Sequence, residues 1–391
     1  MKTYVLARNP TDSVTHGFLP AASRLGLDVT VLTDEPAAHL EMYAGETEVL
    51  GCDVADVSGL VDRIAASAAP AAVFSNSDHL QAQAALVASY FDLPGKDWRA
   101  ALRCRNKALM RSHLAAAGLD AVTSVQLLPA DDPAALDLDY PCVLKPREGV
   151  ASEDVVLVRD AAELVVRVGE IRARRTGALV VEEFLDGPLH TLETVGDGTG
   201  VRVLGGFRTE LSAPPHFVEE RLVWHPDLPE PAVRSVLEQL AALGVGLGAC
   251  HTEFVVQGGR ARLIEVNDRI IGDQCDLLLA DVLGECVFEL VLRTHLGEAL
   301  APSPTPTKRA ARVEYVCAAR LGVLRQAPPA QDVHGPVRLA YRPLRKVGAT
   351  VALAHSNRDY LGVLRAVGDE QAQVDAAVAG FLGAHRWEVG A

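Results

Sequence analysis

Strand-like and helix-like patterns alternate along the first hundred residues, and this alternation restricts the possible folds of the chain more than any other feature. Strand patterns occupy KTYVLAR, LDVTVLTD and AAVFSNSD, and a helical pattern follows each of them. Such alternation predicts a parallel sheet in an open, doubly wound α/β layer. The first turn reads ARNPTDSVTHG in place of the GxGxxG dinucleotide fingerprint. The sequence therefore predicts a Rossmann-like shape without a Rossmann cofactor.

Composition restricts the class of protein further. A chain of 391 residues has room for two or three domains of about 150 residues. It contains no apolar run of bilayer length and no secretory pattern at MKTYVLARNPTDS, so we expect a cytoplasmic protein without membrane contact. The net charge of −14, without any basic run, predicts that nucleic acid is not a partner. Seven scattered cysteines without a CxxC argue against a disulfide framework and a cysteine-rich zinc site.

Beyond the first hundred residues the patterns indicate two further regions. A cationic helical stretch, CRNKALMRSHLAAAGLDA, ends at the helix stop Gly118. Two short strands, YPCVLKP and VVLVR, then enclose the loop REGVASED, and the strand VVEEFL and several hairpins follow. The proline-rich stretch APSPTPTK indicates a boundary near residue 305. We predict an N-terminal domain at 1–98, a central domain at 99–305 with a lid lobe at about 120–183, and a C-terminal lobe at 306–391.

The stretch RLIEVNDRIIGD, residues 262–273, gives the most specific chemical signal. Glu265 and Asn267 are two apart in a strand, so their oxygens lie on one face and can converge on one ion. A two-residue turn places Glu253 of the preceding strand opposite Ile264, whereas a three-residue turn with a bulge places it opposite Glu265. We predict the bulged turn. Hard oxygen ligands then suit Mg²⁺, and the alternative is an acidic pair on a solvated hairpin face.

Lysines are the second signal, because the chain has only six of them. Lys145 ends an apolar strand, where a buried cation needs an anionic partner such as a nucleotide phosphate. The alternatives are a salt bridge to a nearby carboxylate and a side chain that extends its charge to the solvent. Lys107, on the helix upstream, is a second candidate for a phosphate contact, with an exposed surface lysine as the alternative. The loop between the two short strands offers Gly149, Ala151 and Ser152, small residues whose backbone amides can approach phosphate oxygens.

The order of these features resembles that of the ATP-grasp superfamily: a helix lysine, a strand lysine, a small-residue loop, VVEEFLDG, and then Glu253 with the pattern Glu265, Asn267, Arg269. HGFLPAASRLGLDVTVLTD, SNSD and YFDLPG resemble its N-terminal domain, and GGFRTELSAPPHFVEERLVWHPDLP followed by HTEF resembles its amino-acid ligase branch. The similarity is weakest at the C-terminus, where RVEYVCAARLGVL and SNRDYLGVLRAVGD resemble the lobe of biotin carboxylase-like members. The resemblance implies an α/β chain with α+β lobes, namely an ATP-grasp fold with an N-terminal Rossmann-like domain and a small C-terminal lobe.

The resemblance also implies roles for individual residues. Lys107 and Lys145 are expected at the ATP phosphates, and the loop from 148 to 154, with Ser152, is expected to be a mobile lid. Leu189 stands where many members have a ribose-binding glutamate, while His190 matches the histidine of biotin carboxylase-like members, and Asp154 stands where glycine is common. The expected adenine contacts are Glu182, Glu183, Phe184 and Leu185, and the expected ligands of Mg²⁺, or of Mn²⁺, are Glu253, Glu265 and Asn267.

The reaction implied is formation of an amide from a small-molecule carboxylate and an amine through an acyl phosphate, with Arg269 and Lys145 as catalytic residues. Within the loop from 212 to 224, His216 and Glu219 are expected to contact the substrate together with Arg269, and Glu219 to bind an ammonium group. Two alternatives remain: a biotin carboxylase-like or purine-pathway-like enzyme that uses bicarbonate, and an ATP-binding module without turnover. Related proteins are often homodimers, but the sequence leaves the oligomeric state open.

Overall fold

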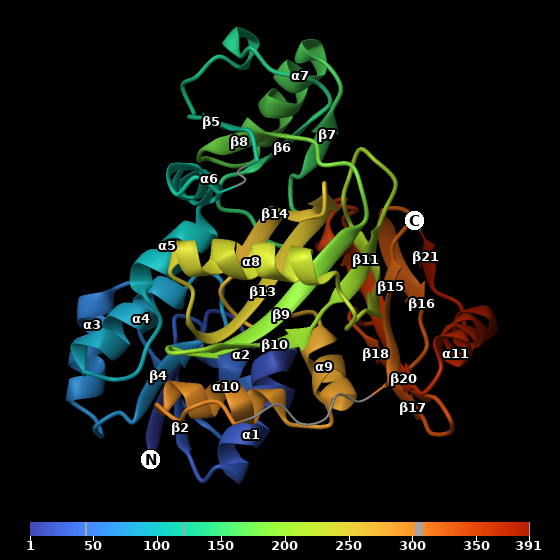
Figure 1. The fold of residues 1–391 in the computed structure, drawn as a ribbon. Helices are drawn as coiled ribbons and strands as arrows, with labels where there is room; N and C mark the ends of the chain where they lie inside the picture. The colour runs from blue at the N-terminus through green and yellow to red at the C-terminus, as the bar shows by residue number, and fades with distance from the viewer. Residues whose placement is uncertain (44, 120–121, 302–307, 391) are drawn as a thin grey trace.

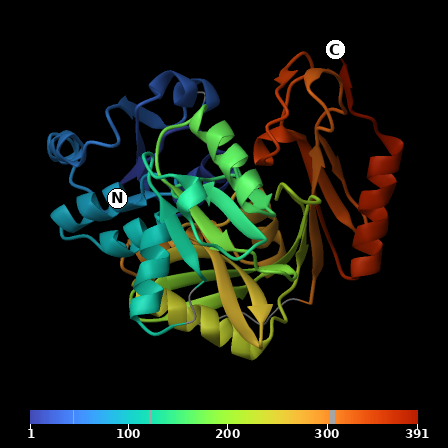
Figure 2. The same ribbon diagram turned by 90° about the horizontal axis from the view of Figure 1, so that it is seen from above.

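The computed structural model describes residues 1–43, 45–119, 122–301 and 308–390 (Figures 1 and 2). Its first region contains a parallel sheet in the order β3-β2-β1-β4, built from β1 (Lys2–Leu6), β2 (Asp28–Thr33), β3 (Glu48–Gly51) and β4 (Ala72–Ser75). The predicted parallel layer is confirmed, and β3 is a strand that the sequence patterns did not indicate. Helices η1 (Ser13–Phe18), α1 (Leu19–Arg24), α2 (Pro36–Tyr43), α3 (Val57–Ala65) and α4 (Gln81–Tyr90) lie between and after these strands.

The predicted single cationic helix is two helices, α5 (Trp98–Arg105) and α6 (Lys107–Ala116). They separate at Asn106, which has extended backbone angles and whose side-chain oxygen accepts a hydrogen bond from the Leu109 N–H at 3.1 Å. Such a cap satisfies an amide that would otherwise lack a partner at the start of a helix. Lys107 is therefore the first residue of α6. Gly118, with a φ of +70°, follows the end of α6 as predicted.

A separate lobe, at the top of Figure 1, carries a four-stranded antiparallel sheet in the order β5-β8-β6-β7. Its elements are β5 (Ser124–Leu127), the 3₁₀ turn η2 (Pro133–Ala135), β6 (Cys142–Pro146), β7 (Val156–Val158), α7 (Ala161–Arg172) and β8 (Leu179–Glu183). Leu144, Val168 and Val181 belong to the core that α7 forms with this sheet. β6 lies between β7 and β8, and Lys145 near its end pairs with Val180 of β8, whereas the pairing with β7 ends at Leu144.

The remaining strands form a ten-stranded sheet that continues from the central region into the last eighty or so residues. The order is β14-β13-β9-β11-β12-β15-β20-β18-β17, with β10 beside β9. Its strands are β9 (Leu189–Asp197), β10 (Val201–Gly205), β11 (Phe207–Leu211), β12 (Glu219–Trp224), β13 (Leu247–Gln257), β14 (Arg260–Asn267), β15 (Ala310–Cys317), β17 (Gln331–Val333), β18 (Arg338–Pro343) and β20 (Tyr360–Gly368). Pairing of β12 with β15 joins the predicted C-terminal lobe to the central sheet.

Helices cover this sheet, and a small second sheet completes the C-terminal part. The helices are α8 (Glu230–Leu243), α9 (Cys275–Leu283), α10 (Val287–His295) and α11 (Gln371–Ala384), and η3 (Asn357–Asp359) is a 3₁₀ turn. The small sheet has the order β19-β16-β21, from β16 (Gly322–Gln326), β19 (Thr350–Val351) and β21 (Glu388–Gly390). The boundary predicted near residue 305 lies within 302–307, outside the described residues.

The β13–β14 hairpin has the predicted strand pairing, but its turn differs from the predicted turn. Gly258 and Gly259, with φ of +57° and +77°, form a two-residue turn, so the predicted three-residue turn is wrong. A bulge between Glu253 and Phe254 on one strand and Leu263 and Glu265 on the other shifts the register inside the hairpin. Glu253 consequently pairs with Glu265, as predicted. Ile264 is the extra residue of the bulge.

Two expectations from composition can be compared with the described residues. The seven cysteines are all free, as the absence of a CxxC indicated. No helix within the described ranges combines the length and the apolar character that a membrane span requires.

Candidate active site

A cavity of about 900 Å³ lies where the N-terminal sheet, the lid lobe, the central sheet and η3 meet. Twelve of the predicted site residues line it: Lys107, Lys145, Ser152, Glu182, Glu183, Phe184, Leu185, Glu219, Glu253, Glu265, Asn267 and Arg269. Two do not line it. The ring of His190 stacks on Phe254 and lies near His225, and the ring of His216 stacks on His355.

One end of the cavity is an apolar slot beside the end of β8. Leu185 and Val255 pack together with Ile264 against them, and these three line the cavity with Val143 and residues 183–184. Ile264 reaches this face because the bulge places two consecutive residues of β14, Ile264 and Glu265, on the same side. An apolar slot next to backbone polar groups is suited to a flat heteroaromatic ring such as adenine.

Next to the slot, a buried ion-pair cluster holds Lys145. Its Nζ lies 2.7 Å from Glu182 Oε2, and Arg111 of α6 donates to the same carboxylate through Nε at 2.8 Å and Nη2 at 2.9 Å. Burial acts to raise the pKa of Glu182, but the two cations lower it well below its usual value. Burial lowers the pKa of Lys145 despite Glu182. The alternative partner of Lys145, a nearby carboxylate, is thus present, and two cations share this one anion.

Arg111, which the sequence patterns did not single out, also supports the hairpin. Its Nη1 and Nη2 donate to the carbonyls of Leu263 and Ile264, at 2.8 and 3.1 Å. A bulge removes strand partners from such carbonyls, and a buried carbonyl without a partner is costly. The guanidinium therefore connects the bulge that aligns Glu253 with Glu265 to the carboxylate that holds Lys145. Its signal in the sequence was only its position four residues after Lys107, one helical turn away.

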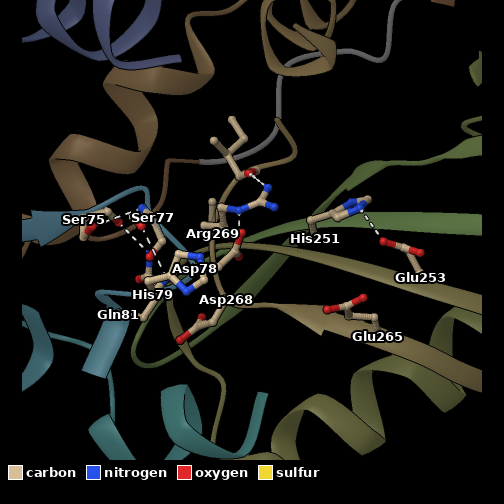
Figure 3. Close-up of polar contacts among 12 residues, drawn as sticks. Ser75, Ser77, Asp78, His79, Gln81, His251, Glu253, Glu265, Asp268 and Arg269 are labelled. Carbon is tan, nitrogen blue, oxygen red and sulfur yellow. Dashed lines mark hydrogen bonds and ion pairs between the residues drawn. The ribbon is translucent and has the colours of Figure 1, made fainter. Parts of the chain in front are cut away.

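The predicted metal ligands are all on the β13–β14 hairpin, and Figure 3 shows two of them, Glu253 and Glu265, on its neighbouring strands. Glu253 is paired with Glu265 across the strands, and its Oε1 lies 3.4 Å from Nε2 of His251. Glu265 Oε1 accepts a hydrogen bond from Lys107 Nζ at 2.9 Å, so Lys107 is buried rather than an exposed surface lysine. Burial acts to raise the pKa of Glu253, but His251 and the lysines hold it below its usual value. Two carboxylates and an amide oxygen form a donor set that fits Mg²⁺.

The lid loop has an unusual backbone and is attached to the C-terminal part of the chain. Ala151, Ser152 and Asp154 all have φ between +54° and +57°, a region that favours glycine. Asp154 is held there by Arg174 and Arg175, at 2.7 and 3.3 Å. Two contacts, which we call the lid latch, join the loop to η3: Ala151 O accepts from the Asn357 N–H at 3.0 Å, and Glu153 Oε1 accepts from Arg358 Nε at 2.7 Å.

Of the two substrate contacts predicted in the loop from 212 to 224, Glu219 lines the cavity and His216 does not. Glu219 Oε2 accepts a hydrogen bond from Asn357 Nδ2 at 3.2 Å, and its backbone carbonyl accepts one from the Tyr360 hydroxyl. Burial, together with the charges of Glu253 and Asp273, raises the pKa of Glu219 to about 8. Within the described residues no lysine or arginine forms an ion pair with it. A carboxylate in this state is suited to a cation that enters with a substrate.

Arg269, at the end of β14, is held by the N-terminal region. Its Nε donates to Asp78 Oδ1 at 2.7 Å and its Nη1 to the carbonyl of Ile270 at 2.8 Å. The adjacent Asp268 is buried against Lys96, with 2.8 Å between Oδ1 and Nζ. The sequence patterns missed Asp78 and Lys96 as site residues. Their signals were the polar SNSD turn after a buried strand and the scarcity of lysine.

Comparisons with known proteins agree with this arrangement. Residues 138–277 match the ATP-grasp domain family. The uncharacterized protein y4rH of Sinorhizobium fredii is 31% identical over 331 residues, which are 79% of this chain and 67% of that protein. The L-amino acid ligase of Bacillus licheniformis superposes with a TM-score of 0.79 at 22% identity, covering 100% and 99% of the two chains. The phosphoribosylglycinamide synthetase of Anaerococcus prevotii superposes with a TM-score of 0.74 at 13% identity, covering 100% and 99%.

Proposed function

Because this chain belongs to the ATP-grasp superfamily, we propose that it is an ATP-dependent carboxylate–amine ligase, which forms an amide from an amino acid or another small acid and releases ADP and phosphate. The ATP-grasp fold expected from the sequence is confirmed by the domain match and the structural similarity. One observation carries the proposal. A single cavity is lined by two lysines, two carboxylates with an asparagine, and an arginine, next to an apolar slot.

ATP is proposed to bind between the lid lobe and the central sheet. The adenine ring would occupy the slot formed by Val143, Leu185, Val255 and Ile264, and the phosphates would lie near Lys107 and Lys145. The lid loop, with Ser152, borders the same space. The ribose role of His190 stays a prediction, which its position beside Phe254 and His225 does not support.

In the first step, an oxygen of the substrate carboxylate attacks the γ-phosphorus of ATP. The bond from that phosphorus to the β,γ-bridging oxygen breaks, and an acyl phosphate and ADP form. The two lysines offset negative charge on the phosphate oxygens. Arg269, with N–H groups on the cavity side, is suited to bind the carboxylate and then the acyl phosphate through two parallel hydrogen bonds.

In the second step, the ammonium group of the amine first loses a proton and its neutral nitrogen then attacks the acyl carbon. The bond from that carbon to the phosphate oxygen breaks, and the nitrogen loses a second proton to the departing phosphate or to water. Glu219 is proposed to bind the amine in its ammonium form, because this carboxylate faces the cavity without a cationic partner among the described residues. Because burial and the neighbouring carboxylates raise its pKa, Glu219 in its ionised form is also a stronger base than an ordinary glutamate and is suited to take up the first of these protons.

The donor set of Glu253, Glu265 and Asn267 is proposed to hold Mg²⁺, with Mn²⁺ as a substitute. When bound, the ion supplies positive charge at the phosphate oxygens. The chain's own contribution is to hold these ligands, since His251 fixes Glu253 and Lys107 fixes Glu265.

The test is phosphate release from ATP with Mg²⁺ present, measured against a panel of amino acids, supplied singly and in pairs, with bicarbonate included. We expect release to require one acid and one amine, to yield ADP rather than AMP, and to disappear in Glu265→Gln. As a matched control, Glu285→Gln removes a carboxylate whose arginine partner, Arg202 at 2.5 Å, lies outside the cavity. This control should keep the wild-type rate.

Two results would replace the proposal. Release that depends on bicarbonate without any amine indicates a carboxylating enzyme. ATP binding without release for any pair, bicarbonate included, indicates an ATP-binding module.

A further inference from the structure

The Arg269 guanidinium is fixed on one edge and free on the other. A guanidinium has five N–H bonds, of which Arg269 uses one on Nε for Asp78 and one on Nη1 for the Ile270 carbonyl. Burial acts to lower the pKa of Arg269, but the Asp78 carboxylate raises it above the usual value. The remaining N–H bonds, one on Nη1 and two on Nη2, have no partner within the described part of the chain, and the side chain lines the cavity.

Asp78 itself is held by a turn that leaves it little freedom (Figure 3). Ser75 Oγ donates to the Leu6 carbonyl at 2.7 Å and accepts from the Ser77 N–H at 3.0 Å. Gln81 Nε2 donates to the carbonyls of Ser75 and Ser77, at 2.8 and 3.1 Å. These bonds tie the turn to the carboxyl ends of β1 and β4. The carboxylate is therefore presented from a rigid edge of the N-terminal sheet.

The segment that follows β14 is held by the N-terminal region at two neighbouring residues, Asp268 and Arg269. Asn267 faces the cavity, Asp268 is buried against Lys96 from the linker before α5, and Arg269 is paired with Asp78. Lys96 Nζ also donates to the carbonyls of Ala249 and Asp268. Both charged residues that follow the metal-ligand strand are thus neutralised by residues of the N-terminal region. Asp268 and Lys96 are shielded from the cavity, whereas Asp78 and Arg269 border it.

We infer that Asp78 is a positioning residue for the catalytic arginine: it fixes the plane of the Arg269 guanidinium so that the free edge faces the reacting carboxylate. This inference rests on the proposed function, because the reaction supplies the carboxylate that Arg269 binds. A planar donor requires its plane to be set before it can make two parallel hydrogen bonds. Misplacement of a binding group by about 1 Å can lower a rate about 100-fold. The N-terminal region thereby contributes directly to catalytic geometry.

The first experiment is a double-mutant cycle on the full chain, with steady-state kinetics on the acid and amine identified for the wild type. Asp78→Ala is expected to lower kcat about 100-fold with little change in the KM for ATP. Asp78→Asn retains an oxygen acceptor for Nε and is expected to recover part of that loss. In the Arg269→Ala background, Asp78→Ala should cause no further loss, because Asp78 acts through Arg269. Equal losses in both backgrounds would overturn the inference.

A second measurement does not depend on turnover and separates this inference from the proposed function. In ¹H–¹⁵N spectra, the Arg269 Nε–H is expected as a slowly exchanging signal, assigned by its absence from Arg269→Lys. This signal should lose its protection in Asp78→Ala and keep it in Glu285→Gln, which breaks the ion pair with Arg202 elsewhere. An unchanged Arg269 signal in Asp78→Ala would overturn the positioning role even if the wild type forms amides. If the signal changes but no acid–amine pair reacts, the proposed function fails and the structural role of Asp78 stands.

Discussion

Glu182→Gln should loosen the lid lobe strongly, because this change leaves two buried cations without their shared anion. The Glu182 carboxylate lies 2.7 Å from Lys145 and accepts two bonds from Arg111 at 2.8 and 2.9 Å. The three side chains are between 3% and 7% exposed. Glutamine has almost the same shape but no charge, so the variant isolates the electrostatic contribution. Breaking a buried ion pair by removing one partner typically destabilises a protein by about 3–5 kcal/mol.

The pH at which to measure follows from the lowered pKa of Glu182. A carboxylate with a lowered pKa in the folded state contributes stability above its unfolded value, near 4.5, and this contribution is lost as the pH falls. At pH 7 the contribution is complete. A loss of about 3–5 kcal/mol corresponds to about a 10²- to 10⁴-fold change in an opening equilibrium, since about 1.4 kcal/mol is a factor of ten.

Native-state hydrogen exchange, followed by mass spectrometry on peptides that cover β6 and β8, measures this opening directly. We expect amides in these strands to exchange at least about 100-fold faster in Glu182→Gln. The matched control is Glu163→Gln on α7 of the same lobe, whose arginine partners lie at 3.6 and 3.8 Å on the surface. That change should cost less than about 1 kcal/mol. Equal exchange rates in the two variants would refute the argument that the buried cluster stabilises the lobe.

Two further predictions concern the lid latch and a buried acid. Arg358→Ala removes the 2.7 Å contact with Glu153 of the lid loop. It should increase the phosphate released per amide formed several-fold, because water then reaches the acyl phosphate. The control Arg342→Ala breaks a surface pair with Asp332 and should leave this ratio unchanged. Burial raises the pKa of Asp276 from 3.8 to about 6, so ionising this acid destabilises the fold as the pH rises. In urea unfolding at pH 7.5, the free energy of unfolding of Asp276→Asn should therefore exceed that of the wild type by about 1–3 kcal/mol, and this difference should disappear below pH 4. The control Asp281→Asn, on the exposed face of α9, should show no such pH-dependent gain. An equal gain at both pH values for Asp276→Asn would contradict the burial argument.

The hairpin illustrates how far sequence reasoning reaches. The period of a strand places Glu265 and Asn267 on one face, and this part of the site followed from residue spacing. The pairing of Glu253 with Glu265 was predicted correctly, but from a three-residue turn that the chain does not have. The bulge lies in mid-strand, where Arg111 satisfies its carbonyls from another element. A contact between residues more than 150 positions apart leaves no local pattern.

The break at Asn106 shows a different limit. Most residues from 104 to 117 are good helix formers, so a single helix up to Gly118 was the reasonable prediction. The side chain of Asn106 instead caps α6, and the Lys107 N–H donates to the Arg147 carbonyl. This tertiary contact favours two helices over one and turns Lys107 toward Glu265.

By itself the sequence determined the alternation that makes the N-terminal sheet parallel, the strand face that carries the carboxylates, and the order of motifs that indicates the superfamily. These features depend on periodicities and on residues that are close in the chain, so they can be recognised from the local sequence alone. Only the tertiary structure decided the partners of the site: Glu182 for Lys145, Asp78 for Arg269, and η3 for the lid loop. Each of these pairs joins charges from different elements, and the free energy that selects such partners comes from burial and packing of the whole molecule.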